Sequence, residues 1–242
     1  MSSKPSVITR KDMKEPDKFQ HAAEQAAGWV AARKRQAVIL GGAAVAAVLL
    51  VLVVLVVQSQ RSEASGAAVS QLLETVGGTV SAVPLPGQPG PFFPTEEAHQ
   101  RAIIGAADQV LAQHGGAAAA LAALAKGDAH LRLREWEPAR AAYQKYLDTA
   151  AKDDSLRFGA LEGVALAAEG QGDLAAAAEG FARMAKEAPA FADRADLERA
   201  RVLAAAGKTD YARQVLAAFP EQHKESPLAP EASQRLGKLG GK

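Results

Sequence analysis

A run of 21 residues near the start of the chain, from Ala37 to Val57, contains no charged side chain and no side chain that can form a hydrogen bond. Because an α-helix rises about 1.5 Å per residue, this run would span roughly 31 Å, close to the thickness of a bilayer's hydrocarbon core. A helix of this length packed inside a globular domain keeps a polar face, and this run has none. The sequence therefore predicts a single transmembrane helix over residues 37–57.

Basic side chains are concentrated before this run. Residues 1–36 hold eight Lys and Arg residues and four acidic ones, whereas residues 58–100 hold one basic residue, Arg61. The positive-inside rule then predicts that the N-terminus is cytoplasmic and that the rest of the chain lies outside. The alternative is a signal peptide cleaved near Ser65, but such peptides have a short basic segment and an apolar stretch of roughly 7–15 residues.

The segment 1–36 also contains a helical pattern. Apolar side chains recur at helical spacing from Pro16 to Val30, with Trp29 beside them. This spacing predicts a cytoplasmic amphipathic helix that leads into the membrane. Two interpretations stay open for it: an extension at the level of the lipid headgroups, or a docking face for a cytoplasmic or membrane partner.

Composition limits what the rest of the chain can do. Residues 37–242 hold 20 basic and 23 acidic side chains, a balance that argues against nucleic-acid binding. The chain has no Cys and no Asn, which excludes disulfides, thiolate metal sites and N-glycosylation. Its 56 alanines and few aromatic residues favour closely packed helices, so the sequence predicts an all-α fold.

Two connecting segments follow the apolar run. Residues 58–76 read as a helical stalk, and residues 77–94 hold five prolines and four glycines, a density that no regular helix survives. We expect 58–94 to be a stalk and an extended linker that sets a helical domain, residues 95–242, off the membrane. Thr95 is the expected N-cap of the first helix of that domain, with Glu96 and Glu97 favourably placed on the helix dipole.

The domain contains an internal repeat. Residues 121–150, 161–189 and 197–222 align as a helix, a short turn and a second helix, and each second helix carries a small residue followed four positions later by a large one. These pairs are Ala139/Tyr143, Ala177/Phe181 and Ala212/Leu216, separated by 38 and 35 residues. A helix–turn–helix period in the mid-thirties resembles tetratricopeptide repeats.

Further residues carry this resemblance. Gly127 and Ala129 stand where the first helix needs small side chains, Gly172-Asp173-Leu174 matches the usual turn, and Pro189 stands at the repeat's closing proline. Arg134 departs from the pattern, because it occupies the place of the turn glycine. Residues 95–113 would be part of a degenerate opening repeat and residues 226–239 a terminal capping helix.

The whole arrangement is similar to the ancillary SecYEG translocon subunit (YfgM-like) family. The features shared are a short basic cytoplasmic helix, one membrane anchor, a linker and a small repeat array over residues 17–240. The resemblance implies a bacterial inner-membrane protein whose repeat domain faces the periplasm. It also implies partners among protein or peptide clients, the SecYEG channel and periplasmic chaperones. The Pro-rich stretch Pro84–Pro94 is longer than this family leads us to expect.

The sequence offers little catalytic chemistry. Gly207-Lys208-Thr209 lacks the earlier glycine of a P-loop, because position 202 is Val, and no strand precedes it. The five histidines are scattered without metal-ligand spacing, and no Ser lies in a Gly-x-Ser-x-Gly motif. We therefore expect no enzyme activity, no metal and no cofactor.

What remains is a surface formed by the first helices of the repeats. The repeat alignment places ten residues on this predicted concave face: Leu124, Asp128, Leu131, Arg132, Glu162, Leu166, Glu169, Arg194, Leu197 and Arg201. Leucines mixed with both charge signs suit an amphipathic helix or an extended peptide as ligand. The leading hypothesis is a membrane-anchored binding module near the translocon. The alternatives are an envelope assembly scaffold, for instance for cytochrome maturation or for cell-wall and division machinery, and an enzyme accessory or hydrolase domain.

Overall fold

The computed structural model of the chain describes residues 49–50, 52–53, 62–82, 87 and 90–240. The predicted cytoplasmic segment 1–36 lies outside these residues, and so does the apolar run 37–57 apart from 49–50 and 52–53, which are helical. Within the described part, no helix has both the length and the apolar character that a membrane crossing requires. A compact unit begins at Ser62 and extends to the end of the chain.

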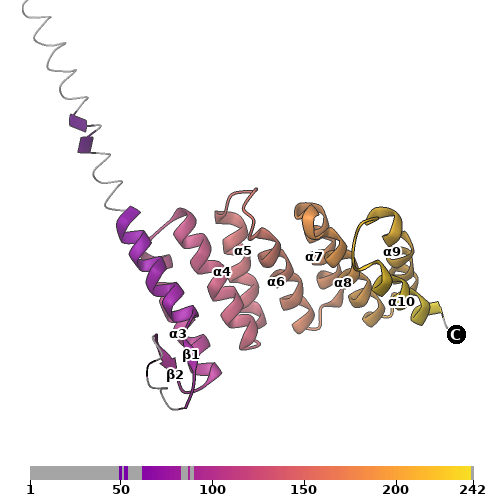
Figure 1. The fold of residues 1–242 in the computed structure, drawn as a ribbon, viewed down its shortest axis with the longest axis horizontal. Coiled ribbons are helices and arrows are strands. Elements are labelled where there is room, and N and C mark those ends of the chain that lie inside the picture. The colour runs from indigo at the N-terminus through magenta and orange to yellow at the C-terminus, as the bar shows by residue number, and fades with distance from the viewer. Residues whose placement is uncertain (1–48, 51, 54–61, 83–86, 88–89, 241–242) are drawn as a thin grey trace, which may run out of the picture. The chain divides into compact units, whose positions relative to one another are not determined.

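This unit is built almost entirely from helices, as predicted. After a first helix over residues 62–76, helices follow one another across Figure 1 in chain order, each packed on the next. Their bounds are α3 Glu96–Gln113, α4 Gly116–Arg132, α5 Trp136–Thr149, α6 Arg157–Gly170, α7 Leu174–Glu187, α8 Ala192–Ala205, α9 Thr209–Gln222 and α10 Ala229–Gly240. A single 3₁₀ turn, η1 Pro189–Phe191, precedes α8. The expected N-cap of α3 is confirmed, because the Thr95 hydroxyl accepts a hydrogen bond from the backbone N–H of Ala98 at 3.1 Å.

The repeats assemble in two sets of helices. The first helices of successive repeats, α4, α6 and α8, contact or bridge one another, and α10 continues this set. The second helices are α5, α7 and α9, which contain the predicted small/large pairs. All six residues of those pairs are at most 2% exposed, which confirms that they form the core.

Close packing between repeats depends on two glycines that enclose one aromatic ring. Tyr143 on α5 is 1% exposed and lies between Gly127 on α4 and Gly163 on α6. A Cβ atom at Gly127 would lie 2.7 Å from Cδ1 and Cε1 of the ring, and one at Gly163 would overlap Cε2 and Cζ. The small residues therefore let two helices close on the same ring, as the repeat pattern requires.

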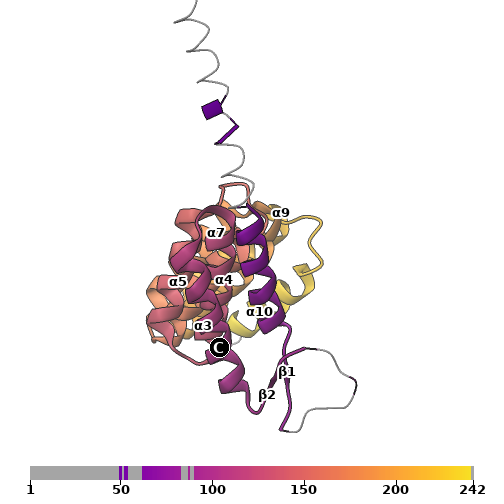
Figure 2. The same ribbon diagram turned by 90° about the vertical axis from the view of Figure 1, so that its left-hand side faces the viewer.

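The segment before α3 differs from the sequence expectation. The helix 62–76 is part of the compact unit, because Leu72 is completely buried in a cluster with Ile103, Ala107 and Val110. The Pro-rich segment closes on itself through a short parallel pair, β1 Thr79–Val80 and β2 Phe92–Phe93. Both lie at the end of the array formed by residues 62–76 and α3 (Figures 1 and 2). The helix 62–76, expected as part of a stalk, therefore belongs to the same compact unit as the repeats.

The turns between paired helices repeat one backbone conformation. Arg134, Gly172 and Gly207 all have positive φ, at 58°, 82° and 74°, and they occupy equivalent places after α4, α6 and α8. Two of the three are glycine, which adopts this conformation without steric cost, whereas a residue with a Cβ atom adopts it only at a steric cost. Arg134 is the non-glycine residue with positive φ in the described part of the chain.

We expect Arg134→Gly to stabilise the protein by about 1 kcal/mol, because it removes left-handed strain from an exposed residue. Chemical denaturation of the full chain measures this change. The matched control is Gly172→Arg, which places the same side chain in the equivalent turn and should destabilise by a similar amount. An unchanged midpoint for Arg134→Gly would show that the turn is not strained.

Candidate functional site

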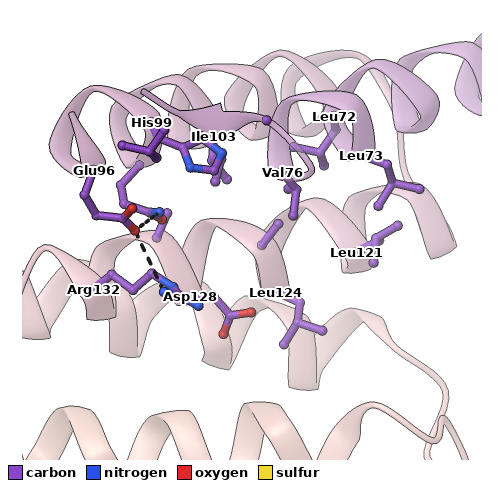
Figure 3. A pocket seen from close by; sticks show the side chains of 15 residues that line it. Leu72, Leu73, Val76, Glu96, His99, Ile103, Leu121, Leu124, Asp128 and Arg132 are labelled. Carbon is purple, nitrogen blue, oxygen red and sulfur yellow. Dashed lines mark hydrogen bonds and ion pairs between the residues drawn. The ribbon is translucent and has the colours of Figure 1, made fainter. Parts of the chain in front are cut away.

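A cleft of about 420 Å³ opens at the start of the array. Its walls come from the helix 62–76, from β1, from α3 and from α4 (Figure 3). Volumes in this range are typical of sites that hold small molecules or a few side chains of a peptide. The cleft contains an apolar part and a polar end.

The apolar part lies between the helix 62–76 and the first half of α4. Leu73 and Val76 are 50% and 41% exposed, and they lie across the cleft from Leu121 and Leu124 (Figure 3). Val80 of β1, also 41% exposed, extends the same wall. These side chains together form the apolar lining of the cleft.

The polar end is formed by the start of α3 and the last turn of α4. Glu96 accepts a hydrogen bond from Gln100 Nε2 at 2.8 Å and lies 3.8 Å from Arg132 Nη1 (Figure 3). His99 is buried; its Nε2 donates to the carbonyl oxygen of Thr75 at 2.8 Å, and its ring stacks on Phe93. These contacts attach α3 to the end of the helix 62–76 and to β2, and so fix the shape of this end of the cleft.

Asp128 lies between the apolar part and the polar end. It follows Leu121, Leu124 and Ala125 on one face of α4, since these positions are one and two helical turns apart. The Tyr143 hydroxyl donates to its Oδ1 at 2.6 Å. Desolvation raises the pKa of Asp128, and the hydrogen bond from Tyr143 and the charge of Arg132 oppose this rise. Burial of the hydroxyl, followed by the nearby Asp128 charge, raises the pKa of Tyr143, so the phenol stays protonated as the donor.

The structure divides the ten predicted surface residues into three groups. Leu124, Asp128 and Arg132 line the cleft. The other leucines serve the core: Leu131 and Leu166 are partly buried against the main cluster, and Leu197 is buried, at 4% exposed, so it offers no contact surface. The last group consists of the charged residues of α6 and α8, Glu162, Glu169, Arg194 and Arg201.

These charged residues pair with each other between repeats. Arg194 Nη2 lies 2.6 Å from Glu162, and Arg201 contacts Glu169 through Nη1 and Nη2 at 2.6 and 2.7 Å. Arg201 also binds Glu198 on its own helix at 2.6 Å. The hydrogen bonds that Arg201 donates to Glu169 lower the pKa of Glu169 and raise the pKa of Arg201. The two pairs link α6 to α8 with the same separation of 32 residues.

Sequence reasoning missed the wall supplied by the helix 62–76. The signal was present, because Ala68, Val69, Leu72, Leu73 and Val76 form an apolar stripe at helical spacing. That stripe indicates a helix packed on a partner rather than a free stalk. The stalk interpretation ignored it because the neighbouring Pro-rich segment separates these residues from the repeats along the chain.

In the part of the chain that the structure describes, no three His, Asp or Glu side chains are placed to hold a metal ion. The cleft offers contact with apolar side chains and with the charged groups of Glu96, Asp128 and Arg132. A scan against protein-family models gives no match for this chain, and no curated protein matches its sequence.

Proposed function

We propose that the chain is a non-enzymatic, membrane-anchored protein-binding module whose repeat domain faces the periplasm and holds apolar segments of protein clients. The observation that carries this proposal is the half-exposed apolar cleft formed by Leu73, Val76 and Val80 opposite Leu121 and Leu124. Covering a Leu or Val side chain completely is worth about 1.5–3 kcal/mol, so filling a cleft with several half-exposed ones supplies a useful part of a binding free energy. A cleft of this volume accommodates a short peptide segment better than the surface of a folded protein.

The helical array that presents this cleft has features that support its interpretation as a tetratricopeptide-like solenoid. Its supporting features are the two sets of helices, the buried small/large pairs and the repeated positive-φ turns. Such arrays are rigid supports for peptide binding, because each repeat is held by its neighbours. The order of basic segment, apolar run and repeats is the basis for proposing a YfgM-like role near the SecYEG channel in the bacterial inner membrane.

In-cell photocrosslinking tests the proposal. A photoreactive residue at Val76 should capture channel subunits, periplasmic chaperones or exported proteins, whereas the same residue at Tyr211 should not. Tyr211 is the matched control because it is 62% exposed on α9, outside the cleft. A reporter fused after Lys242 should be active only outside the cytoplasm.

The identity of the captured protein separates the hypotheses. Cytochrome-maturation or division proteins at Val76 would favour the assembly scaffold. Equal crosslinking from Val76 and Tyr211, or capture of cytosolic proteins alone, would contradict the proposal.

A further inference from the structure

The cleft combines an apolar wall with a carboxylate that has spare hydrogen-bonding capacity. Asp128 Oδ1 accepts the Tyr143 hydroxyl, and no donor among the described residues is paired with Oδ2. Arg132 acts on Asp128 only through its charge, and its guanidinium lies 3.8 Å from Glu96. An ionised carboxylate accepts several hydrogen bonds, so Asp128 can still receive a cation.

Charge at this end of the cleft is unbalanced. Two carboxylates, Glu96 and Asp128, face one cation, Arg132, among the charged residues that line the cleft. His99 lines the same end, and its Nε2 donates to the carbonyl oxygen of Thr75 and not to Asp128. Behind Tyr143, Glu162 is matched by Arg194. One positive charge from a ligand would neutralise the excess negative charge of Glu96 and Asp128 over Arg132.

The position of the carboxylate defines the spacing of the ligand. Asp128 is one helical turn beyond Leu124 and two turns beyond Leu121 on the same face of α4 (Figure 3). A helical or extended peptide that lays apolar side chains against these leucines therefore brings a neighbouring side chain to Asp128. A Lys or Arg is suitable because its methylene stem can lie along the apolar wall while its charged end reaches the carboxylate.

We propose that the cleft selects apolar peptide segments that carry a basic side chain at one end, with Asp128 as the residue that recognises the cation. This inference rests on the proposed function, because it specifies which segments the binding module would hold. Apolar segments with an acidic or neutral end would contact the same apolar wall but would leave the Asp128 carboxylate without a cation.

Peptide binding to the full chain in lipid nanodiscs tests this inference. The probes are short peptides of Leu, Ala and Ser that differ at one terminal position, which is Lys, Met or Glu, with empty nanodiscs as the blank. We expect the Lys peptide to bind about fivefold more tightly than the Met peptide, and the Glu peptide more weakly than both. Asp128→Asn should make the Lys and Met peptides bind equally, because the amide oxygen still accepts from Tyr143 but the side chain carries no charge.

Two further variants complete the design. Asp148→Asn removes an exposed carboxylate from α5, outside the cleft, and should keep the preference for Lys. Asp128→Lys should reverse the order, so that the Glu peptide binds best. Equal binding of all three peptides to the unmodified chain would overturn the inference and leave the binding module intact. Binding of none of them would overturn both.

Discussion

Replacing Gly163 with alanine should lower the free energy of unfolding by about 3 kcal/mol, because the added methyl group has no space. The new Cβ would lie 2.7 Å from Cε1 of Tyr143 and would overlap Cε2 and Cζ. The ring cannot move away, since Gly127 borders it from α4 and its hydroxyl is held by Asp128. Relief therefore requires α5 and α6 to separate, which costs packing along the whole interface between two repeats.

Gly159→Ala is the matched control for this prediction. Gly159 lies on the same helix, α6, with no atom within 4 Å of the position that a Cβ would take. Alanine there should be neutral or stabilise by up to about 1 kcal/mol, because it is the better helix former. Urea denaturation of the full chain followed by circular dichroism measures both variants. Equal midpoints for Gly163→Ala and Gly159→Ala would show that Tyr143 does not lock the two repeats together.

The second large effect is expected from Arg157, which joins three helices. Arg157 is 9% exposed at the start of α6; its Nη1 donates to the carbonyl oxygen of Leu147 on α5 at 3.0 Å, and its Nη2 to Glu187 on α7 at 3.1 Å. Arg157→Met keeps most of the apolar volume but leaves the Leu147 carbonyl without this donor. We expect the free energy of unfolding to fall by about 2 kcal/mol. This is less than the loss for breaking a completely buried ion pair, because Glu187 keeps its contact with Arg183.

Arg194→Met provides the comparison for Arg157. Arg194 also pairs with a glutamate of a neighbouring helix, Glu162, at 2.6 Å, but its side chain is 55% exposed. Exposed pairs contribute roughly 0.2–1 kcal/mol, so this variant should change stability little, and less still in high salt. Denaturation midpoints at low and high salt distinguish the two residues. The interpretation fails if Arg194→Met proves as destabilising as Arg157→Met.

Much of the repeat domain could be predicted from the sequence because its pattern is periodic. The small/large pairs Ala139/Tyr143 and Ala177/Phe181 define which face of each second helix is buried, and the structure places all four residues in the core. The capping helix α10 also lies where it was expected. These features depend on spacing along one helix, which the sequence shows directly.

The cleft was harder to predict because it joins segments that are distant in the sequence. Leu124, Asp128 and Arg132 were identified from the repeat alignment, but Leu73 and Val76 line the cleft from a helix that precedes the Pro-rich segment in the chain. The charged residues of α6 and α8 were predicted as ligand contacts, and in the structure Glu169 and Arg201 pair with each other. A sequence alone does not show whether a surface charge meets a ligand or a neighbouring repeat.

The pairing of β1 with β2 has a consequence for how this protein can vary. The backbone N–H of Thr79 donates to Pro91, and that of Ser81 donates to Phe93, at 2.9 and 2.8 Å. These bonds hold the two ends of the intervening stretch side by side as parallel strands. Insertions between them would leave the wall of the cleft at Val80 undisturbed, whereas deletions would pull the parallel pair apart, because such a connection needs about a dozen residues. This position is therefore where related chains should tolerate added length and where an epitope tag could be introduced.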